Sequence, residues 1–329
     1  MAALLEKAYS WGFVSGRVNV LERGLLTQDF YQSLLAHQRT EDLLRHLQET
    51  PLRDAVNAAG TWVDWSAIID QHFYEQVASL RKDCPDERLP DLFLLQGDYQ
   101  NLKRALTKRA VYPFPHAVLT QELLASVAAC DLIALPEPYK ALAQEAVEHL
   151  DAGKSIAELD IKLDAAYLRH LLESVRALKV PLITEYFEAS VLARAALVLW
   201  RSFLAGNSLS APAAALLPMD NLTQPIRDLV AAADPKQWGG VIPGKLGEVF
   251  NAHVESDDAD AAQGLELAAN DYLASLARRG VGQVFGPERV FSYICELALQ
   301  AYNLKVVVCG RLSKIDAEVL KRRLRKSHA

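Results

Sequence analysis

Two short segments hold residues whose types and spacing could do chemistry, and the first of them could bind a phosphate. Gly153, Lys154 and Ser155 match the end of a phosphate-binding loop. Such a loop cradles phosphates with backbone N–H groups, and it needs a glycine five positions before its Gly-Lys pair. That position is occupied by Glu148. We therefore predict no nucleotide site at this segment.

The second segment could bind a metal ion. His72 and Glu75 stand three positions apart on a predicted helix next to Asp70, a spacing that occurs in helical bundles with two metal ions. Such bundles need a second motif, of the Glu-x-x-His kind, and the sequence has none. His253, two positions before Glu255, lies in a polar stretch predicted as a loop. The simpler interpretations are a partly exposed helix face and a polar loop, so we predict no catalytic, cofactor-binding or metal-binding residues.

The sequence does repeat a set of anchor residues. The tripeptide Leu-Thr-Gln occurs three times, beginning at Leu26, Leu119 and Leu222, and we call the segments that follow copies 1, 2 and 3. In each copy an acidic residue follows 44 or 45 positions after the leucine, and a basic residue follows 30 to 39 positions after the acid. The acids and bases are Asp70 with Lys103, Asp164 with Arg194, and Glu266 with Lys305. Self-similarity at a fixed period marks repeated structural units, so three similar subdomains are predicted.

The anchors also suggest local roles. Thr27, Thr120 and Thr223 are predicted helix N-caps, because a threonine hydroxyl can accept a hydrogen bond from an otherwise unpaired backbone N–H group. The acid and the base of one copy are predicted to face each other between two helices of that copy. Removing one partner of a buried pair would cost about 3–5 kcal/mol. If the pairs lie at the surface instead, their coupling stays below about 1 kcal/mol.

Helical periodicity covers most of the chain and predicts an all-α fold. Residues 26–50 show it continuously, with Pro51 as a stop or restart. The other predicted helices are 64–80, 93–108, 119–129, 138–150, 159–178 and 182–204. The β-branched run 304–309 continues a helical pattern from Pro287 and is predicted as buried helix.

Proline and glycine separate the copies and set the predicted subdomain boundaries. Prolines at 112–115 and the stretch 206–218 precede copies 2 and 3, and a further loop is predicted at 234–247. The acidic stretch 256–260 is predicted as a solvated loop. These boundaries divide the chain into three helical subdomains, residues 1–112, 113–207 and 208–329, which we expect around a pseudo-threefold axis.

The composition is that of an ordinary globular protein. The chain has 329 residues, of which 51% are apolar and 23% charged, and this excludes a mainly disordered protein. The formal net charge of −6 argues against general binding of nucleic acids. The cysteines have no Cys-x-x-Cys spacing, so neither a zinc site nor a disulfide framework is predicted and a reducing cytosol is expected. They are Cys84, Cys130, Cys295 and Cys309.

No segment has the roughly 18 consecutive apolar residues that a membrane-spanning helix needs. Four charged residues interrupt the nearest candidate, 180–203: Glu185, Glu188, Arg194 and Arg201. The first nine residues already carry two charges and lack the pattern of a signal peptide. We therefore expect that the chain does not enter a membrane by itself.

The C-terminal stretch 311–328 is basic, with seven Lys or Arg residues against two acidic ones. Basic side chains near the end of a helix complement its dipole, and that is the simpler interpretation. The alternative is a contact with anionic lipid headgroups or with an acidic protein face.

Three segments also follow the pattern of a known family. They are the stretch 9–26 with Arg17, Val18, Leu21 and Glu22; the segment Gly-Asp-Tyr-Gln-Asn-Leu-Lys at 97–103; and the stretch from Phe-Gly-Pro-Glu at 285–288 through Tyr293, Glu296, Asn303, Leu304, Lys305, Gly310 and Arg311. Together they resemble the C-subunit family of A/V-type (archaeal and vacuolar) ATPases, whose eukaryotic member is called the d subunit. The resemblance covers essentially the whole chain. One departure is that Ala189 and Leu192 of copy 2 replace the Asp and Asn that accompany Lys103, so no polar role is expected there.

The resemblance implies an all-helical funnel of three similar subdomains that is not an enzyme and holds no cofactor. It implies a central-stalk rotor subunit, one copy per complex, whose partners are the central shaft subunits of the soluble head and the membrane proteolipid ring, with no nucleic acid. Such a subunit transmits torque between ATP hydrolysis or synthesis and proton or sodium transport. It also implies a peripheral position on the cytoplasmic face of the membrane.

Two other classes stay open on the residues alone. A helical adaptor would bind another protein in its concave face, although unequal helix lengths and a period near 100 residues weigh against it. A metal-dependent helical enzyme would be built around His72 and Glu75, and analysis of the purified protein for iron and manganese would test it.

Overall fold

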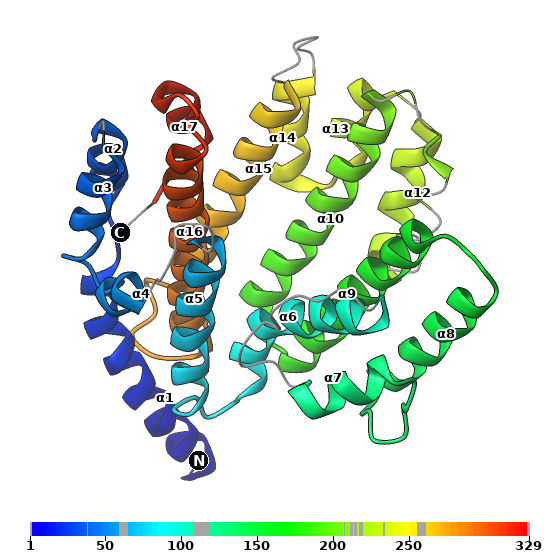
Figure 1. Ribbon diagram of the computed structural model, residues 1–329, viewed down its shortest axis with the longest axis horizontal. Helices are drawn as coiled ribbons and strands as arrows, with labels where there is room; N and C mark the ends of the chain where they lie inside the picture. Colours follow the sequence, from blue (N-terminus) through cyan, green and yellow to red (C-terminus); the bar gives the residue numbers. More distant parts are fainter. Residues whose placement is uncertain are drawn as a thin grey trace. The chain divides into compact units, whose positions relative to one another are not determined.

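A computed structural model describes most of the chain (Figure 1). The described residues are 2–37, 39–58, 65–107, 119–204, 206, 208–210, 213, 216, 220–232, 234–254 and 261–327. Every secondary-structure element in these ranges is a helix, so the all-α prediction is confirmed for this part of the chain. The predicted linker at 112–115, most of 206–218 and the acidic stretch 256–260 lie outside the described residues.

The elements follow one another with short connections. In the first 106 residues they are α1 (Ala2–Leu21), η1 (Glu22–Gly24), α2 (Gln28–Ala36), α3 (Thr40–Leu47), α4 (Arg53–Ala58), α5 (Trp65–Arg81) and α6 (Arg88–Leu106). The middle of the chain forms α7 (Gln121–Ala128), α8 (Tyr139–Asp151), α9 (Ile156–Leu178) and α10 (Pro181–Leu204). The last part forms η3 (Asp220–Leu222), α12 (Thr223–Ala232), η4 (Pro235–Gln237), α13 (Trp238–Val241), α14 (Gly244–Val254), α15 (Ala261–Arg278), α16 (Pro287–Leu312) and α17 (Ala317–Arg323).

The predicted helices from α5 to α10 are confirmed, and so is the buried helix at 304–309, which lies inside α16. The stretch 26–50 differs, because it forms two helices rather than one. His37 and Arg39 both have extended backbones, which ends α2 and starts α3. Both helices bury leucines in the same core, and the continuous apolar pattern therefore hid the break.

The stretch 234–247, predicted as a loop, is also wrong in part, since it contains η4, α13 and the start of α14. Its glycines serve close packing. A Cβ at Gly247 would lie 2.2 Å from the Ile242 carbonyl oxygen, and one at Gly239 would collide with the Asn251 side chain. His253, predicted in a loop, lies in the last turn of α14, where Nδ1 is 2.9 Å from the Val249 carbonyl oxygen.

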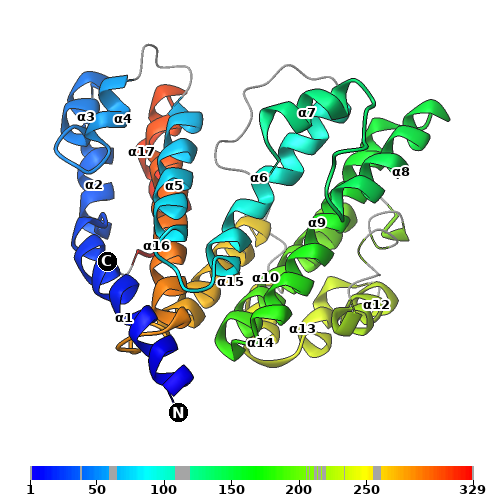
Figure 2. The same ribbon diagram turned by 90° about the horizontal axis from the view of Figure 1, so that it is seen from below.

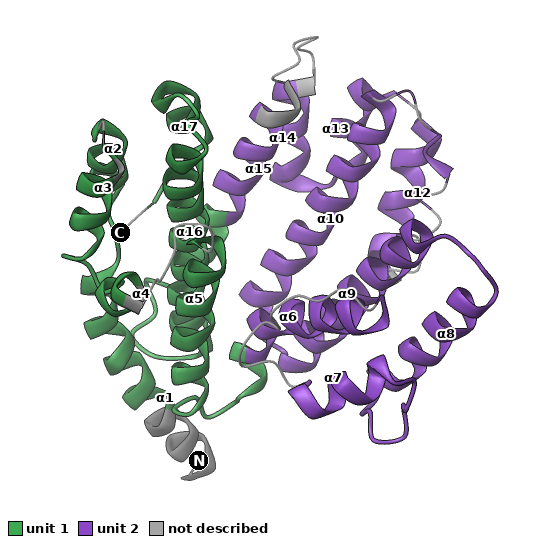
Figure 3. Ribbon diagram, viewed as in Figure 1, with its two compact units in different colours: residues 1–90, 274–329 green, residues 91–273 purple. Residues whose placement is uncertain are grey.

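The chain forms two compact units (Figure 3). Unit 1 consists of residues 1–90 and 274–329, and unit 2 of residues 91–273. The three predicted subdomains and their pseudo-threefold arrangement stay predictions.

Helix α16 is the centre of unit 1. It contacts α1, α2, α3, α5 and α17, and Figures 1 and 2 show it alongside α5 and α17. Its sequence explains this position, because apolar residues cover several of its faces and most of its length is buried. Gly310 lets α17 approach closely, since a Cβ there would lie 2.4 Å from a methyl carbon of Leu320. The unit therefore packs its helices around a single buried one.

Unit 2 is built on the helical hairpin of α9 and α10. Lys179, in the left-handed conformation, ends α9, and Pro181 begins α10 after a one-residue connection. Helix α8 packs on α9, while α12 packs on α10 and continues into α13 and α14. Along their inner faces α9 and α10 bury mainly Leu, Ala and Val side chains.

Helix α7 ends with a non-glycine residue in the left-handed conformation, Cys130, with φ 60°. The Asp131 N–H donates to the Ser126 carbonyl and the Cys130 N–H to the Val127 carbonyl, which is the helix-ending pattern that favours glycine. We expect Cys130→Gly to raise the free energy of unfolding by about 0.5–1 kcal/mol, because glycine adopts this conformation without the steric cost of a Cβ. Urea denaturation of both proteins measures it. Since Cys130 is exposed, Cys130→Ala is the control and should change little; a glycine variant less stable than the alanine variant contradicts the prediction.

Candidate functional site

The segment Gly153 to Ser155 is a turn between two helices. Gly153 has a φ of 68° and ends α8, and the Lys154 N–H donates to the His149 carbonyl oxygen at 3.2 Å. Ser155 caps α9 and accepts a hydrogen bond from the Ala157 N–H at 3.2 Å. These backbone groups close and open helices, so the geometry agrees with the prediction that no phosphate-binding loop is formed.

The candidate metal residues lie on α5 and are not assembled into a site. Glu75 is exposed and accepts a hydrogen bond from Gln71 at 2.8 Å. Burial lowers the pKa of the half-buried His72. Across the part of the chain that the structure describes, no three His, Cys, Asp or Glu side chains gather closely enough to hold a metal ion.

The repeated acids and bases do form ion pairs, but between copies. Nζ of Lys103 on α6 lies 2.8 Å from Oδ1 of Asp164 on α9, which joins copy 1 to copy 2. Nζ of Lys305 on α16 lies 2.5 Å from Oδ1 of Asp70 on α5, which joins copy 3 to copy 1. The predicted pairing within each copy is therefore wrong. Spacing along the chain locates the charged residues, but it does not say which copy supplies the neighbouring helix.

The pair between copies 2 and 3 uses a different base. Arg194 hydrogen-bonds Tyr167 on α9, and Arg201, two turns further along α10, pairs with Glu266 on α15. In all three cases the base-bearing helix of one copy is thus linked to the acid-bearing helix of the next.

A second set of links between copies was not predicted. Asp98 and Gln300 stand five positions before Lys103 and Lys305. Oδ1 of Asp98 accepts the backbone N–H of Leu119 at 2.7 Å, and Oε1 of Gln300 accepts that of Leu26 at 2.9 Å. These two leucines begin the repeated tripeptide of the next copy. The available signal was a polar residue at the same position before the base in an otherwise apolar helix.

Asp98 is almost fully buried, at 1% exposure, and its second oxygen is also bonded. The Tyr139 hydroxyl donates to Oδ2 at 3.3 Å. Burial, reinforced by the Asp98 charge, raises the pKa of Tyr139 far above its ordinary value. Next to it, the Tyr99 hydroxyl lies 3.2 Å from Nδ1 of His170, whose pKa burial lowers. The start of copy 2 is therefore held by a buried, hydrogen-bonded polar group.

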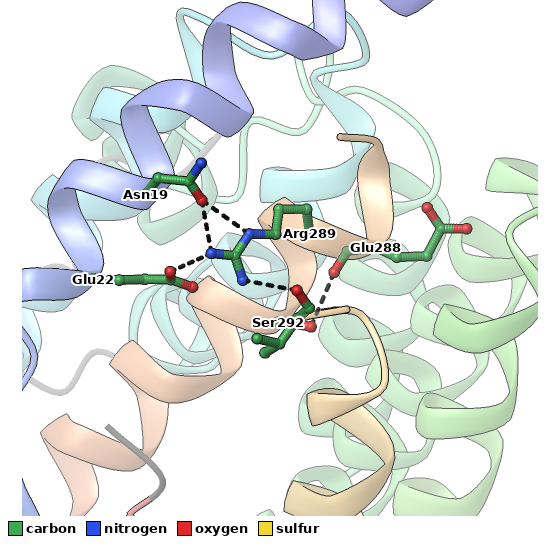
Figure 4. Close-up of polar contacts among 6 residues, drawn as sticks. Asn19, Glu22, Glu288, Arg289 and Ser292 are labelled. Carbon is green, nitrogen blue, oxygen red and sulfur yellow. Dashed lines mark hydrogen bonds and ion pairs between the residues drawn. The ribbon is translucent and has the colours of Figure 1, made fainter. Parts of the chain in front are cut away.

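In unit 1 a buried arginine links α16 to α1 (Figure 4). Arg289 is 7% exposed. Its guanidinium donates to Oδ1 of Asn19 at 2.7 and 3.2 Å, to the Glu22 carboxylate, and to the Val281 carbonyl oxygen at 3.4 Å. A buried charge is stable only when it is paired and hydrogen-bonded, and all these partners come from α1, η1 and the loop before α16.

Two neighbouring contacts complete this region. Arg17 on α1 pairs with Asp83 and also donates to the Ser79 carbonyl oxygen at 3.1 Å. On the other side of α16, the Ser292 hydroxyl donates to the Ala277 carbonyl oxygen at 2.5 Å. Gly280 permits this approach, since a Cβ there would lie 2.2 Å from the Glu288 carbonyl oxygen.

The C-terminal segment closes onto the first tripeptide. The Asn303 side chain donates to the Arg325 carbonyl oxygen at 2.9 Å and accepts the Arg325 N–H at 3.0 Å. Arg325 also stacks over the Tyr302 ring, 3.5 Å from its centroid. The Ser327 N–H donates to Oε1 of Gln28 at 3.1 Å. The end of the basic stretch is thus fixed by backbone contacts.

The predicted caps are confirmed in two copies. Thr27 accepts a hydrogen bond from the Phe30 N–H at 3.3 Å, and Thr120 accepts one from the Leu123 N–H at 3.4 Å. For Thr223 the prediction is wrong, because this residue is already the first residue of α12 and turn η3 directly precedes it.

These contacts define an all-helical protein whose buried polar residues join its helices and its repeated copies to one another. Over residues 14–323 the chain matches the ATP synthase (C/AC39) subunit family, and it belongs to that family. A search of curated proteins finds no match. Among the described residues, no helix has both the length and the apolar character needed to cross a membrane.

The pair of Lys103 and Asp164 offers a direct test of the links between copies. We expect a double-mutant cycle with Lys103→Met and Asp164→Asn to give a coupling of about 0.5–1 kcal/mol, since the Asp164 side chain is 59% exposed and solvent screens the pair. Thermal or urea unfolding measures it. A cycle of Lys103→Met with Glu266→Gln, whose partner is Arg201, is the control and should be additive. Additivity in both cycles contradicts the assigned pair.

Proposed function

We propose that this chain is a non-catalytic central-stalk subunit of the rotor of an A/V-type ATPase or ATP synthase. It connects the central shaft of the soluble head to the membrane proteolipid ring, and it passes torque between ATP hydrolysis or synthesis and proton or sodium transport. The observation that carries the proposal is membership of the ATP synthase (C/AC39) subunit family over residues 14–323.

The contacts between copies support this role. A part that transmits torque must resist shear between its helices, and buried, bonded polar groups resist it because separating them would leave unpaired groups in an apolar core. Asp98, Gln300 and Arg289 are such groups, each bonded to a segment distant in the sequence. The cyclic order of the ion pairs, copy 1 to 2, 2 to 3 and 3 to 1, supports the proposed pseudo-threefold arrangement of residues 1–112, 113–207 and 208–329.

The proposal places the protein peripherally on the cytoplasmic face of the membrane, in one copy per complex. It needs neither a cofactor nor nucleic acid. We expect the purified chain alone to show no ATP hydrolysis and no bound iron or manganese, and metal analysis of the same sample would also test an enzyme built around His72 and Glu75.

Affinity purification tests the partners. The tagged chain, expressed in its own cells and extracted from native membranes in mild detergent, should bring down the shaft subunits and the proteolipid ring. The untagged chain from the same cells is the control. Recovery of neither shaft nor ring would falsify the proposal. Recovery of one unrelated protein instead would support the helical adaptor.

A further inference from the structure

The links between copies can be compared as three joints. A joint is the set of contacts that the base-bearing helix of one copy makes with the tripeptide and the acid-bearing helix of the next. Joint 1–2 involves α6 with the start of α7 and with α9, joint 2–3 involves α10 with α12 and α15, and joint 3–1 involves α16 with the start of α2 and with α5. All the contacts of each joint lie within one compact unit.

The buried acceptor differs between the joints. In joints 1–2 and 3–1 the side chains of Asp98 and Gln300, 1% and 6% exposed, accept the N–H of the tripeptide leucine. The equivalent position of joint 2–3, five residues before Arg194, is Ala189. An alanine side chain has no hydrogen-bond acceptor, so this link cannot form in joint 2–3.

Joint 2–3 has a more exposed contact close by. Oε1 of Glu188, the residue before Ala189, accepts a hydrogen bond from Nδ2 of Asn221 at 3.0 Å and is also paired with Arg176. The Asn221 side chain is in contact with water. Water competes for such a contact, which therefore holds the two segments less firmly than a buried link to the backbone.

The helix starts and the ion pairs follow the same order. Thr27 and Thr120 cap α2 and α7, whereas Thr223 lies inside α12. In the ion pair of joint 2–3 both side chains are more than a third exposed, with 59% for Arg201 and 35% for Glu266. The other two pairs each contain a better buried base, with 13% for Lys103 and 32% for Lys305. Exposed pairs are screened by water and salt.

From these three differences we propose that joint 2–3 is the compliant joint of the protein and opens more readily than the other two. The buried acceptor, the capped helix and the shielded ion pair are all replaced there by weaker contacts. Motion within this chain is therefore concentrated where α12 meets α10. This inference concerns the isolated chain and does not depend on the proposed function.

Hydrogen exchange of the purified full-length chain tests the proposal. The three tripeptide leucines are all buried, and α2, α7 and α12 are of similar length, so they form a matched set. After correction for intrinsic rates, we expect the amide of Leu222 and the first turns of α12 to exchange at least tenfold faster than Leu26, Leu119 and the first turns of α2 and α7. Equal or slower exchange at α12 overturns the proposal, and this comparison needs no variant.

Two variants test the assigned cause. Ala189→Gln supplies an acceptor at the position where Gln300 provides one, and it should slow exchange at Leu222; Ala189→Met, of similar length without a comparable acceptor, should not. The reverse change, Gln300→Met, should speed exchange at Leu26 at least tenfold. Equal effects of Gln and Met at position 189, or no effect of Gln300→Met, overturn the assignment of compliance to the missing acceptor.

Discussion

Replacing Arg289 with methionine is expected to lower the free energy of unfolding by about 3–5 kcal/mol. The guanidinium is buried and bonded to Asn19 and Glu22, and its loss leaves the Glu22 carboxylate, 26% exposed, without this cation. Because these bonds connect α16 to α1 and η1, the variant should also raise hydrogen exchange in α1. Urea denaturation of the purified chain measures the stability.

Two further variants separate the buried charge from the loss of packing. Arg88→Met removes an arginine that is 59% exposed and paired with Asp86, and it should cost less than about 1 kcal/mol. Glu22→Gln in the Arg289→Met background should recover part of the loss, because the unpaired charge is gone. If Arg289→Met costs no more than Arg88→Met, the link between α1 and α16 does not carry the stability assigned to it.

Replacing Asp98 with alanine is expected to cost about 2–4 kcal/mol, since a buried N–H at Leu119 and a buried hydroxyl at Tyr139 both lose their acceptor. Asp98→Asn should cost less, because the amide oxygen can still accept the Leu119 N–H. Thermal and urea unfolding of the three proteins measure the differences.

An exposed aspartate in the same unit provides the control for this prediction. Asp131 accepts the Ile133 N–H at 3.3 Å at the surface, so Asp131→Ala should change stability by about 0.5 kcal/mol or less. An equal cost for Asp98→Ala and Asp131→Ala contradicts the view that the buried acceptor holds the start of copy 2.

The fold could largely be predicted because helical periodicity is a local property. Helices α5 to α10 follow from the apolar pattern, and Thr27 and Thr120 begin helices as their chemistry predicts. The break at His37 could not be predicted, since the leucines on both sides face the same core. The glycines near α13 looked like loop residues because only the folded chain shows the Asn251 side chain beside Gly239.

The contacts between copies show where the sequence stops being informative. The positions of Lys103 and Lys305 were identified correctly as anchors, but their partners were assigned to the wrong copies. Pairing depends on which helices pack together, and spacing along the chain does not determine that. Arg289 was not predicted at all, because a single arginine gives no sign of burial until Asn19 and Glu22 are seen beside it.

The most direct test of the proposed function compares ATP-driven ion transport in native membranes from cells that have or lack this chain. We predict that transport is lost without the chain and is restored by the wild-type chain, while the purified chain alone hydrolyses no ATP. A variant such as Arg88→Met, which alters an exposed contact, should restore transport equally well. Unchanged ATP-driven transport in membranes that lack the chain would contradict the account.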